Sequence, residues 1–243
     1  MKPALTLWTI VLTALFVVGG VTRSSTQAQG AASVVIQTKE PGNDLVYADF
    51  GTMKYDRPAS NRGGFIQIFS FQENQQMPAK VKGREGANPP APELVRVTKD
   101  DPNVAASFDY ALLAPNQYAG VGMIIIGMTD HDDKAVADDV TGYSYLTLQA
   151  SATGVSSLTV EFLSQGQGIN ISVGSPQANI QLTPGFNVYK IPLSQLAQPA
   201  WAPVKVSTKD VLKKLTAINF IVGCAPCTTT KGRVVLDNIV LHR

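Results

Sequence analysis

Few side chains in this chain of 243 residues have the types and spacing that site chemistry requires. Two histidines, His131 and His242, and two cysteines, Cys224 and Cys227, exclude a zinc site built from three histidines or four thiolates. The sequence has no Gly-x-Ser-x-Gly nucleophile elbow. Glycoside hydrolysis needs two carboxylates that face each other, and only Glu161 among the five glutamates falls in a clear strand pattern. We therefore predict that the protein is not an enzyme.

A pattern suited to sugar binding runs through the segment YSYLTLQA. Tyr145, Thr147 and Gln149 alternate with Leu146 and Leu148, so the first three share one face of a strand. A sheet face binds a pyranose through a flat aromatic ring and through amide or carboxylate groups that bond its hydroxyls. We predict that the leucines face the core and the other three side chains face a glycan. Cross-strand packing of the tyrosine is the alternative.

Glu161 has the same outward parity as Thr159 in the next strand segment, LTVEFL. Trp201 is placed beside a loop, where it either rims a cleft or closes the edge of the core. The predicted ligand-binding residues are Tyr145, Thr147, Gln149, Glu161 and Trp201.

The two cysteines form the sequence Cys224-Ala225-Pro226-Cys227 between two strand-like segments. The outer Cα atoms of a β-turn lie within the distance that a disulfide accepts, and we predict a disulfide between them. Free thiols and a redox-active pair are the alternatives. Redox chemistry requires a helix N-terminus that lowers a thiol pKa, and the flanking segments here are strand-like.

Two further groups of acids are candidates for metal binding. In the final strand one parity holds Val235, Asp237, Ile239 and Leu241, so Asp237 must be either hydrogen-bonded or metal-bound. The segment 129–140 is the densest acidic stretch, but it lacks EF-hand spacing, and we predict a solvated loop there.

The N-terminal segment predicts export. Residues 1–28 combine a positive start, an apolar run over Ala4–Val18 and small residues that suit cleavage. A retained signal anchor is the alternative. We expect a flexible tether over 29–42, a folded domain over 43–243, and a secreted or periplasmic location.

The overall charge argues against several partners. The chain has 20 Lys and Arg against 18 Asp and Glu; removal of Lys2 and Arg23 with the signal leaves 20 − 2 = 18 against 18. Without a basic stripe we expect no nucleic-acid partner, and no membrane contact beyond the signal segment.

The positioning elements are short strands joined by turns rich in Gly and Pro, with one short helix at Thr208–Leu215. This pattern predicts an all-β fold, a single antiparallel jelly-roll β-sandwich. The proline-rich segment 72–93 does not fit it, and we predict a structureless surface insertion, with a lid or partner-binding loop as the alternative. The predicted strands are Leu45–Phe50, Gly64–Phe71, Leu94–Lys99, Ala105–Leu112, Gly120–Met128, Tyr145–Ala150, Ser157–Leu163, Ile169–Val173, Phe186–Pro192, Thr216–Val222 and Arg233–His242.

The order of motifs YADFG, FDYALLAPNQYAGVGMII, DVTGYSYLTLQA, LTVEFL, FNVYKIPLSQL, LTAINF and GRVVLDNIVL resembles the galactose-binding-like family-eleven carbohydrate-binding modules and the complex I intermediate-associated protein family. The resemblance covers about residues 45–243 and implies a jelly roll that binds either a glycan or a protein partner. In such modules an acid of the last strand joins the N-terminal strand in a structural calcium site. The resemblance therefore implies Asp49 and Asp237 as calcium ligands.

Overall fold

The structure is a computed structural model that describes residues 35–37, 44–54, 56–71, 79–99, 103–115, 117–124, 136–164, 174–223 and 229–243. All of these belong to one unit, Ala32–Arg243. The predicted signal segment 1–28, the strand predicted at Ile169–Val173, and Cys224 and Cys227 lie outside the described residues.

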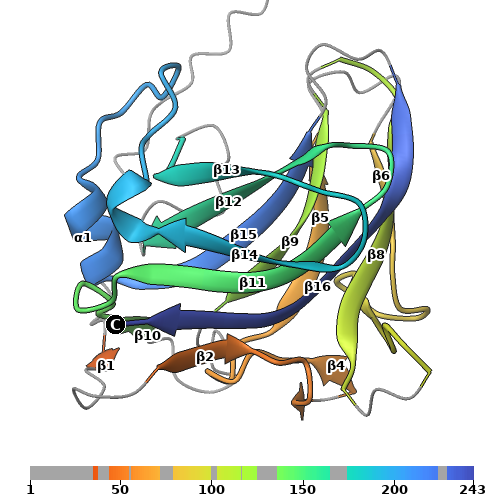
Figure 1. The fold of residues 1–243 in the computed structure, drawn as a ribbon, viewed down its shortest axis with the longest axis horizontal. Coiled ribbons are helices and arrows are strands. Elements are labelled where there is room, and N and C mark those ends of the chain that lie inside the picture. The colour runs from red at the N-terminus through yellow and green to blue at the C-terminus, as the bar shows by residue number, and fades with distance from the viewer. Residues whose placement is uncertain are drawn as a thin grey trace, which may run out of the picture. The chain divides into compact units, whose positions relative to one another are not determined.

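Two sheets pack face to face and form an antiparallel jelly-roll sandwich, as the sequence predicts (Figure 1). Among the described pairs only β1 and β10 run parallel. The inner faces of both sheets supply a common core, with Leu146 and Leu148 from one sheet and Phe162 and Phe220 from the other fully buried. Apolar burial from alternating positions is the main stabilising contribution of such a sandwich.

Sheet B carries the first and last strands of the predicted domain side by side. β14 forms one edge, followed by β11 and β16; β8 pairs with the first half of β16 and β2 with its end. Its strands are β2 (Leu45–Ala48), β6 (Lys80–Lys82), β7 (Glu93–Val95), β8 (Ala105–Leu112), β11 (Tyr145–Ala152), β14 (Asn187–Pro192) and β16 (Thr230–His242).

Sheet A forms the second layer. Its central order is β5, β9, β15, β12, β13, and β10 pairs with the start of β15. Its strands are β1 (Val35–Gln37), β5 (Ile66–Phe71), β9 (Tyr118–Ile124), β10 (Val136–Asp138), β12 (Ser157–Ser164), β13 (Gln177–Gln181) and β15 (Leu215–Gly223). A separate hairpin pairs β3 (Met53–Lys54) with β4 (Arg57–Pro58).

Helical structure in the described chain is confined to short pieces. The 3-10 turn η2 (Leu193–Gln195) follows β14, and α1 (Thr208–Lys213) begins one residue after Ser207, whose hydroxyl accepts a hydrogen bond from the Asp210 amide. Neither is long or apolar enough to cross a membrane, and no other helix of the described chain is.

The described part of the segment 72–93 contains strand residues that the sequence does not predict. Lys80–Lys82 form β6, which pairs with β8, and Glu93 begins β7 on the same partner strand. These pairings join positions far apart in the sequence, so the local proline content does not reveal them. β1 likewise falls inside the predicted tether 29–42.

A β-bulge in β16 corrects the predicted parity of the last strand. Val234 and Leu236 face the core before the bulge, and Ile239 and Leu241 face it afterwards. Asn238 has φ 48°, and two residues of β16 oppose Leu148 there. Asp237 therefore does not interrupt the apolar face.

Candidate functional site

The predicted ligand residues divide between the two sheets. Tyr145, Thr147 and Gln149 lie on the outer face of sheet B, the face turned away from sheet A, and each is half-buried. Leu146 and Leu148 between them are fully buried, so the predicted alternation is confirmed. Glu161 lies in sheet A, so it does not share a face with Tyr145.

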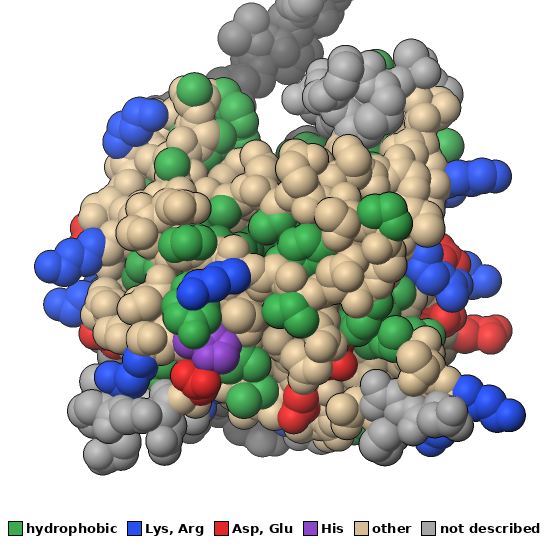
Figure 2. Space-filling view, viewed as in Figure 1, with side chains coloured by type: hydrophobic (Ala, Val, Ile, Leu, Met, Phe, Trp, Pro, Cys, Tyr) green, Lys and Arg blue, Asp and Glu red, His purple; other side chains and the backbone are tan. Residues whose placement is uncertain are grey.

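Both faces of the Tyr145 ring are covered. The imidazole of His242 stacks on it with ring centroids 4.7 Å apart and an interplanar angle of 17°. Lys190 Nζ lies 3.7 Å from the ring centroid; because the stacked imidazole leaves no space for an ammonium, it covers the opposite ring face. Figure 2 shows this side of the molecule, with histidine, lysine and carboxylate side chains close together.

Hydrogen bonds connect the polar groups around this ring. His242 Nδ1 lies 2.7 Å from Asp44 Oδ2, and its Nε2 lies 2.7 Å from Thr147 Oγ1. Asn238 Nδ2 donates to Gln149 Oε1 at 3.2 Å. Thr147 and Gln149 are thus bonded to neighbouring side chains of the same face.

Glu161 is buried, in contrast to the exposed position that the sequence predicts. Its side chain accepts from Asn219 Nδ2 at 3.0 Å and from the Ser175 amide at 3.4 Å, and the residue is 3% exposed. Burial raises the pKa of the Glu161 carboxyl above its ordinary value, while these two donors oppose part of the rise. The sequence misses this because Ser175, a partner from outside the strand, covers the carboxyl.

Glu161 belongs to a line of four polar side chains and one glycine that crosses the outer face of sheet A. Residues paired directly across adjacent strands point to the same face. The pairing of β5, β9, β15, β12 and β13 places one residue of each strand in a single line across the sheet, and we call this line the amide row. It consists of Gln67, Gly122, Asn219, Glu161 and Gln177.

A second line of paired residues runs beside the amide row, two positions away along each strand. It contains the Phe69 ring, and we call it the aromatic row. A Cβ at Gly120 would lie 2.8 Å from Phe69 Cζ, so the Phe69 ring reaches across the β9 backbone. Thr159 Oγ1 donates to Asn179 Oδ1 at 2.6 Å at the other end of the row. The row consists of Phe69, Gly120, Ile221, Thr159 and Asn179.

Sequence reasoning missed most of this face, although two signals for it exist. Asn219 is a single amide within the apolar run LTAINFIV, and Gly120 and Gly122 repeat at the period of a strand. A repeated glycine in a strand marks a close approach of another group, here the Phe69 ring.

Trp201 lies beside the chain segment that bonds Glu161. Its side chain is 60% exposed. A Cβ at Gly174 would lie 3.0 Å from Trp201 Cζ3, and Gly174 directly precedes Ser175, whose amide bonds Glu161. Trp201 and Glu161 therefore belong to one region of the molecule.

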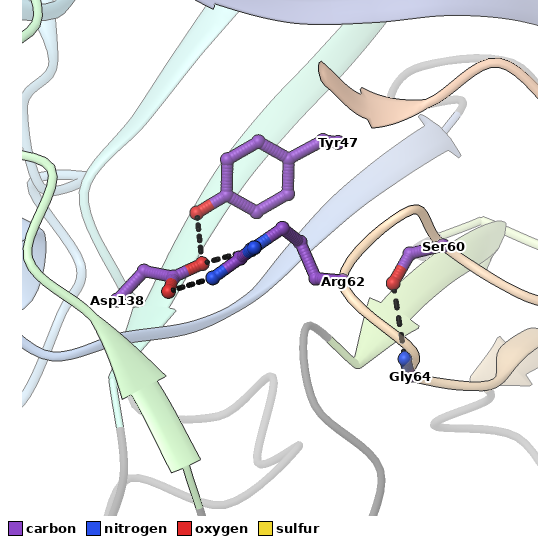
Figure 3. A network of polar contacts seen from close by, with 5 residues as sticks. All are labelled: Tyr47, Ser60, Arg62, Gly64 and Asp138. Atoms are coloured by element: carbon purple, nitrogen blue, oxygen red, sulfur yellow. Dashed lines mark hydrogen bonds and ion pairs between the residues drawn. The ribbon is translucent and has the colours of Figure 1, made fainter. Parts of the chain in front are cut away.

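A buried ion pair lies between the sheets. Arg62 donates from Nε and Nη2 to the two oxygens of Asp138 at 2.9 and 2.7 Å, and the Tyr47 hydroxyl donates to the same carboxylate at 3.2 Å (Figure 3). Asp138 is 1% exposed, which corrects its predicted place in a solvated loop. The donors are supplied within the cluster, so its role is structural.

The two predicted calcium ligands accept hydrogen bonds from amides. Asp49 Oδ1 accepts from the Gly51 amide and Oδ2 from Asn61 Nδ2, both at 3.0 Å. Asp237 Oδ1 accepts from the Asn238 amide at 2.8 Å, as in the backbone-bonded alternative for this residue. No group of three or more His, Cys, Asp or Glu residues suited to a metal occurs in the described parts of the chain. Calcium binding stays a prediction.

No protein-family model matches the chain, and no curated protein matches it. A family 11 carbohydrate-binding module of a cellulosomal cellulase of Clostridium thermocellum is similar at 13% identity and a TM-score of 0.49, covering 82% of this chain and 94% of the module. A family 30 module of another cellulosomal cellulase of that organism is similar at 11% identity and a TM-score of 0.41, covering 62% of this chain and 80% of the module. A CBM28 module specific for non-crystalline cellulose is similar at 11% identity and a TM-score of 0.40, covering 87% of this chain and 99% of the module. These values are too low to carry over a site or a ligand.

Proposed function

We propose that the protein is an exported, non-catalytic carbohydrate-binding protein whose site is the outer face of sheet A. The observation that carries the proposal is the amide row, which runs across five strands beside the Phe69 ring. Export is supported by the segment 1–28 of the sequence.

The chemistry of these two rows matches that of a sugar chain. A pyranose ring offers hydroxyls, which both donate and accept, and an apolar face of C–H groups. Side-chain amides likewise donate and accept, and an aromatic ring gives an apolar platform. Gln67, Phe69, Thr159 and Gln177 are half-buried and Asn179 is exposed, so they are the contact groups. The buried pair Glu161 and Asn219 lies between Gln67 and Gln177 in the amide row.

The distribution of acids supports a non-catalytic role. Hydrolysis of a glycosidic bond uses two carboxylates about 5–9.5 Å apart across the scissile bond. Among the described outward positions of β5, β9, β12, β13 and β15, Glu161 is the only carboxylate, and Ser175 and Asn219 bond it.

The Tyr145 side of sheet B is the other candidate face, predicted from the sequence. Its ring is covered by His242 and Lys190, and its polar groups bond to one another. A sugar would have to displace Lys190 before it could stack there.

The test begins with a glycan array, followed by calorimetric titration of the retained glycan against single variants. Phe69→Ala and Gln67→Ala should weaken binding at least about tenfold, equivalent to roughly 1.4 kcal/mol. Tyr145→Ala is the matched control on the opposite sheet and should leave the affinity unchanged. The melting temperature of each variant is measured beside its affinity.

Two results overturn the proposal in different ways. If Tyr145→Ala loses binding and Phe69→Ala keeps it, the site lies on sheet B, as the sequence predicts. If the array and a panel of insoluble polysaccharides retain no protein, the carbohydrate-binding role is wrong.

A further inference from the structure

A hollow of about 600 Å³ lies on sheet B, over the neighbouring strands β6, β8 and β16. This volume is within the range of small-molecule sites in proteins. The hollow is separate from the Tyr145 side of the sheet, because it adjoins the first residues of β16 and Tyr145 pairs with His242 at the other end. Its lining residues include Lys80, Lys82, Asp109, Ala111 and Lys231.

Ala111 forms the floor of the hollow between two lysines. Tyr110 and Leu112 on either side of it belong to the core, so Ala111 points to the outer face of the sheet. It pairs with Lys80 of β6 on one side and with Lys231 of β16 on the other, and paired residues point to the same face. Adjacent strands are about 4.8 Å apart, so the two exposed lysines leave the backbone about 10 Å apart. Only a methyl group lies between them.

The acid of the hollow is already paired with an arginine. Asp109 accepts hydrogen bonds from Arg233 Nε and Nη2 at 2.6 and 3.1 Å, one on each carboxylate oxygen. These bonds lower the pKa of Asp109 from its ordinary value. Among the described residues no acid forms an ion pair with Lys80 or Lys231. Two ammonium groups of the hollow are thus left without a carboxylate in the described chain.

Protection of the sheet edge explains only part of this positive charge. Three lysines and one acid line the hollow, and the adjoining Arg233 and Glu93 add one charge of each sign, so an excess of two positive charges remains. Lysines on an edge strand oppose aggregation, which accounts for Lys80 and Lys82 of β6. That reason does not apply to Lys231, because β16 lies inside the sheet. A hollow with an excess of one charge concentrates ligands of the opposite charge.

We propose that this hollow is a second binding site, which takes a carboxylate- or sulfate-bearing segment of a glycan. Lysine ammonium groups are point charges that bind either anion without a fixed geometry. The methyl group of Ala111 and the hydrocarbon stems of the lysines offer an apolar surface to the C–H face of a sugar ring. The inference rests on the carbohydrate-binding role proposed above for the class of ligand, and it adds a site on the other sheet and a preference for acidic sugars.

Calorimetric titrations with matched probes test the preference. The probes are a galacturonate hexamer with its methyl-esterified form, and a sulfated galactan oligosaccharide with its desulfated form. At about 0.01 M ionic strength we expect at least one acidic probe to bind about ten times or more tightly than its neutral counterpart. The ratio should fall at about 1 M salt, which screens exposed charges. The pair with the larger ratio identifies a carboxylate or a sulfate as the anion.

A substitution at the floor assigns the preference to the hollow. Ala111→Glu places a carboxylate between Lys80 and Lys231, where opposite charges on paired positions stabilise a sheet. We expect this variant to bind the acidic probe at least about tenfold more weakly without a lower melting temperature. Ala111→Gln introduces a side chain of the same size without the charge, so it should lose less affinity.

Removal of the two lysines gives an independent measurement. The double variant Lys80→Gln with Lys231→Gln should also bind the acidic probe at least about tenfold more weakly. The matched control removes two exposed lysines outside the hollow, by Lys205→Gln with Lys209→Gln. It should keep the affinity. An equal loss in the two double variants would show nonspecific attraction and overturn the inference.

The outcomes separate this inference from the proposed function. Equal affinity for acidic and neutral probes removes the acid preference and leaves the carbohydrate role intact. If Phe69→Ala loses acidic binding and Ala111→Glu keeps it, the acidic glycan binds sheet A and the hollow is not a site. If Ala111→Glu loses acidic binding, Phe69→Ala keeps it and the array retains no neutral glycan, the hollow is supported and the site proposed on sheet A is wrong.

Discussion

At the residue scale, the carboxyl of Glu161 links the candidate site to pH. Its pKa is raised by burial, so the folded protein keeps this proton at pH values where the unfolded chain has lost it. The stability that this proton gives is complete below the unfolded pKa of about 4.5 and is lost as the pH rises through the folded pKa.

Glu161→Gln removes that titration. We therefore expect the variant to gain stability relative to the natural protein as the pH is raised from about 4 to about 8. Urea unfolding at several pH values measures the difference. A gain that is the same at every pH would contradict a raised pKa.

Tyr145 also gives a residue-scale prediction. Tyr145→Ala removes the stacking on His242 and the contact with Lys190, and we expect a loss of about 1–2 kcal/mol of unfolding free energy. Tyr145→Phe keeps the ring and should lose much less. Chemical denaturation measures both. A loss of about 3–5 kcal/mol, typical of a fully buried aromatic ring, would show that the ring belongs to the core.

At the element scale, the success of sequence reasoning depends on how local the signal is. The alternation in Tyr145–Ala150 assigned both faces of β11, and the strand predicted over Phe186–Pro192 ends at the same residue as β14. The bulge at Asn238 reversed the parity of β16, because one extra residue leaves no trace in an apolar pattern. Which sheet holds β12, and hence where Glu161 lies, depends on pairing with the distant β15.

The glycine of the aromatic row gives an element-scale prediction. Gly120→Ala would place a Cβ 2.6 Å from the Phe220 carbonyl oxygen and 2.8 Å from Phe69 Cζ. Because β9 lies between β5 and β15, its backbone has little freedom to move, and we expect a loss of about 1–3 kcal/mol. Thermal unfolding measures it. Gly142→Ala, whose nearest atom would be 3.8 Å away, is the control.

The bulge also determines how the calcium prediction is tested. It holds Asp237 against the Asn238 amide, while Asp49 lies one residue beyond the end of β2, the strand that pairs with β16. A metal bound only by the folded state adds about 2.7 kcal/mol at a hundredfold excess over its dissociation constant. A chelator should then lower the melting temperature, and Asp237→Ala should remove that sensitivity. An unchanged melting curve with chelator contradicts the prediction.

At the scale of the whole molecule, the cluster of Tyr47, Arg62 and Asp138 connects the two layers. Tyr47 belongs to β2 of sheet B, Asp138 ends β10 of sheet A, and Arg62 comes from the loop before β5 (Figure 3). Burial, followed by the nearby Asp138 carboxylate, raises the pKa of Tyr47 well above its ordinary value.

Tyr47→Phe tests this connection through alkaline stability. Above about pH 10 the unfolded chain loses the phenolic proton while the folded protein keeps it, so stability falls as the pH rises. The variant should be less stable by about 1 kcal/mol near neutral pH, because one hydrogen bond is lost. The stability of the variant should also fall less steeply than that of the natural protein above pH 10. Equal slopes for the two proteins would show that Tyr47 does not titrate differently on unfolding.

The edge strand β14 has a consequence for crowded surroundings. An unpaired strand edge is a template on which a second molecule can add its own strand and start aggregation. β14 ends at Pro192, which has no N–H to offer, and carries the exposed charge of Lys190. Both features oppose intermolecular strand addition along this edge. Molecules crowded together at high concentration are therefore protected from strand addition along this edge.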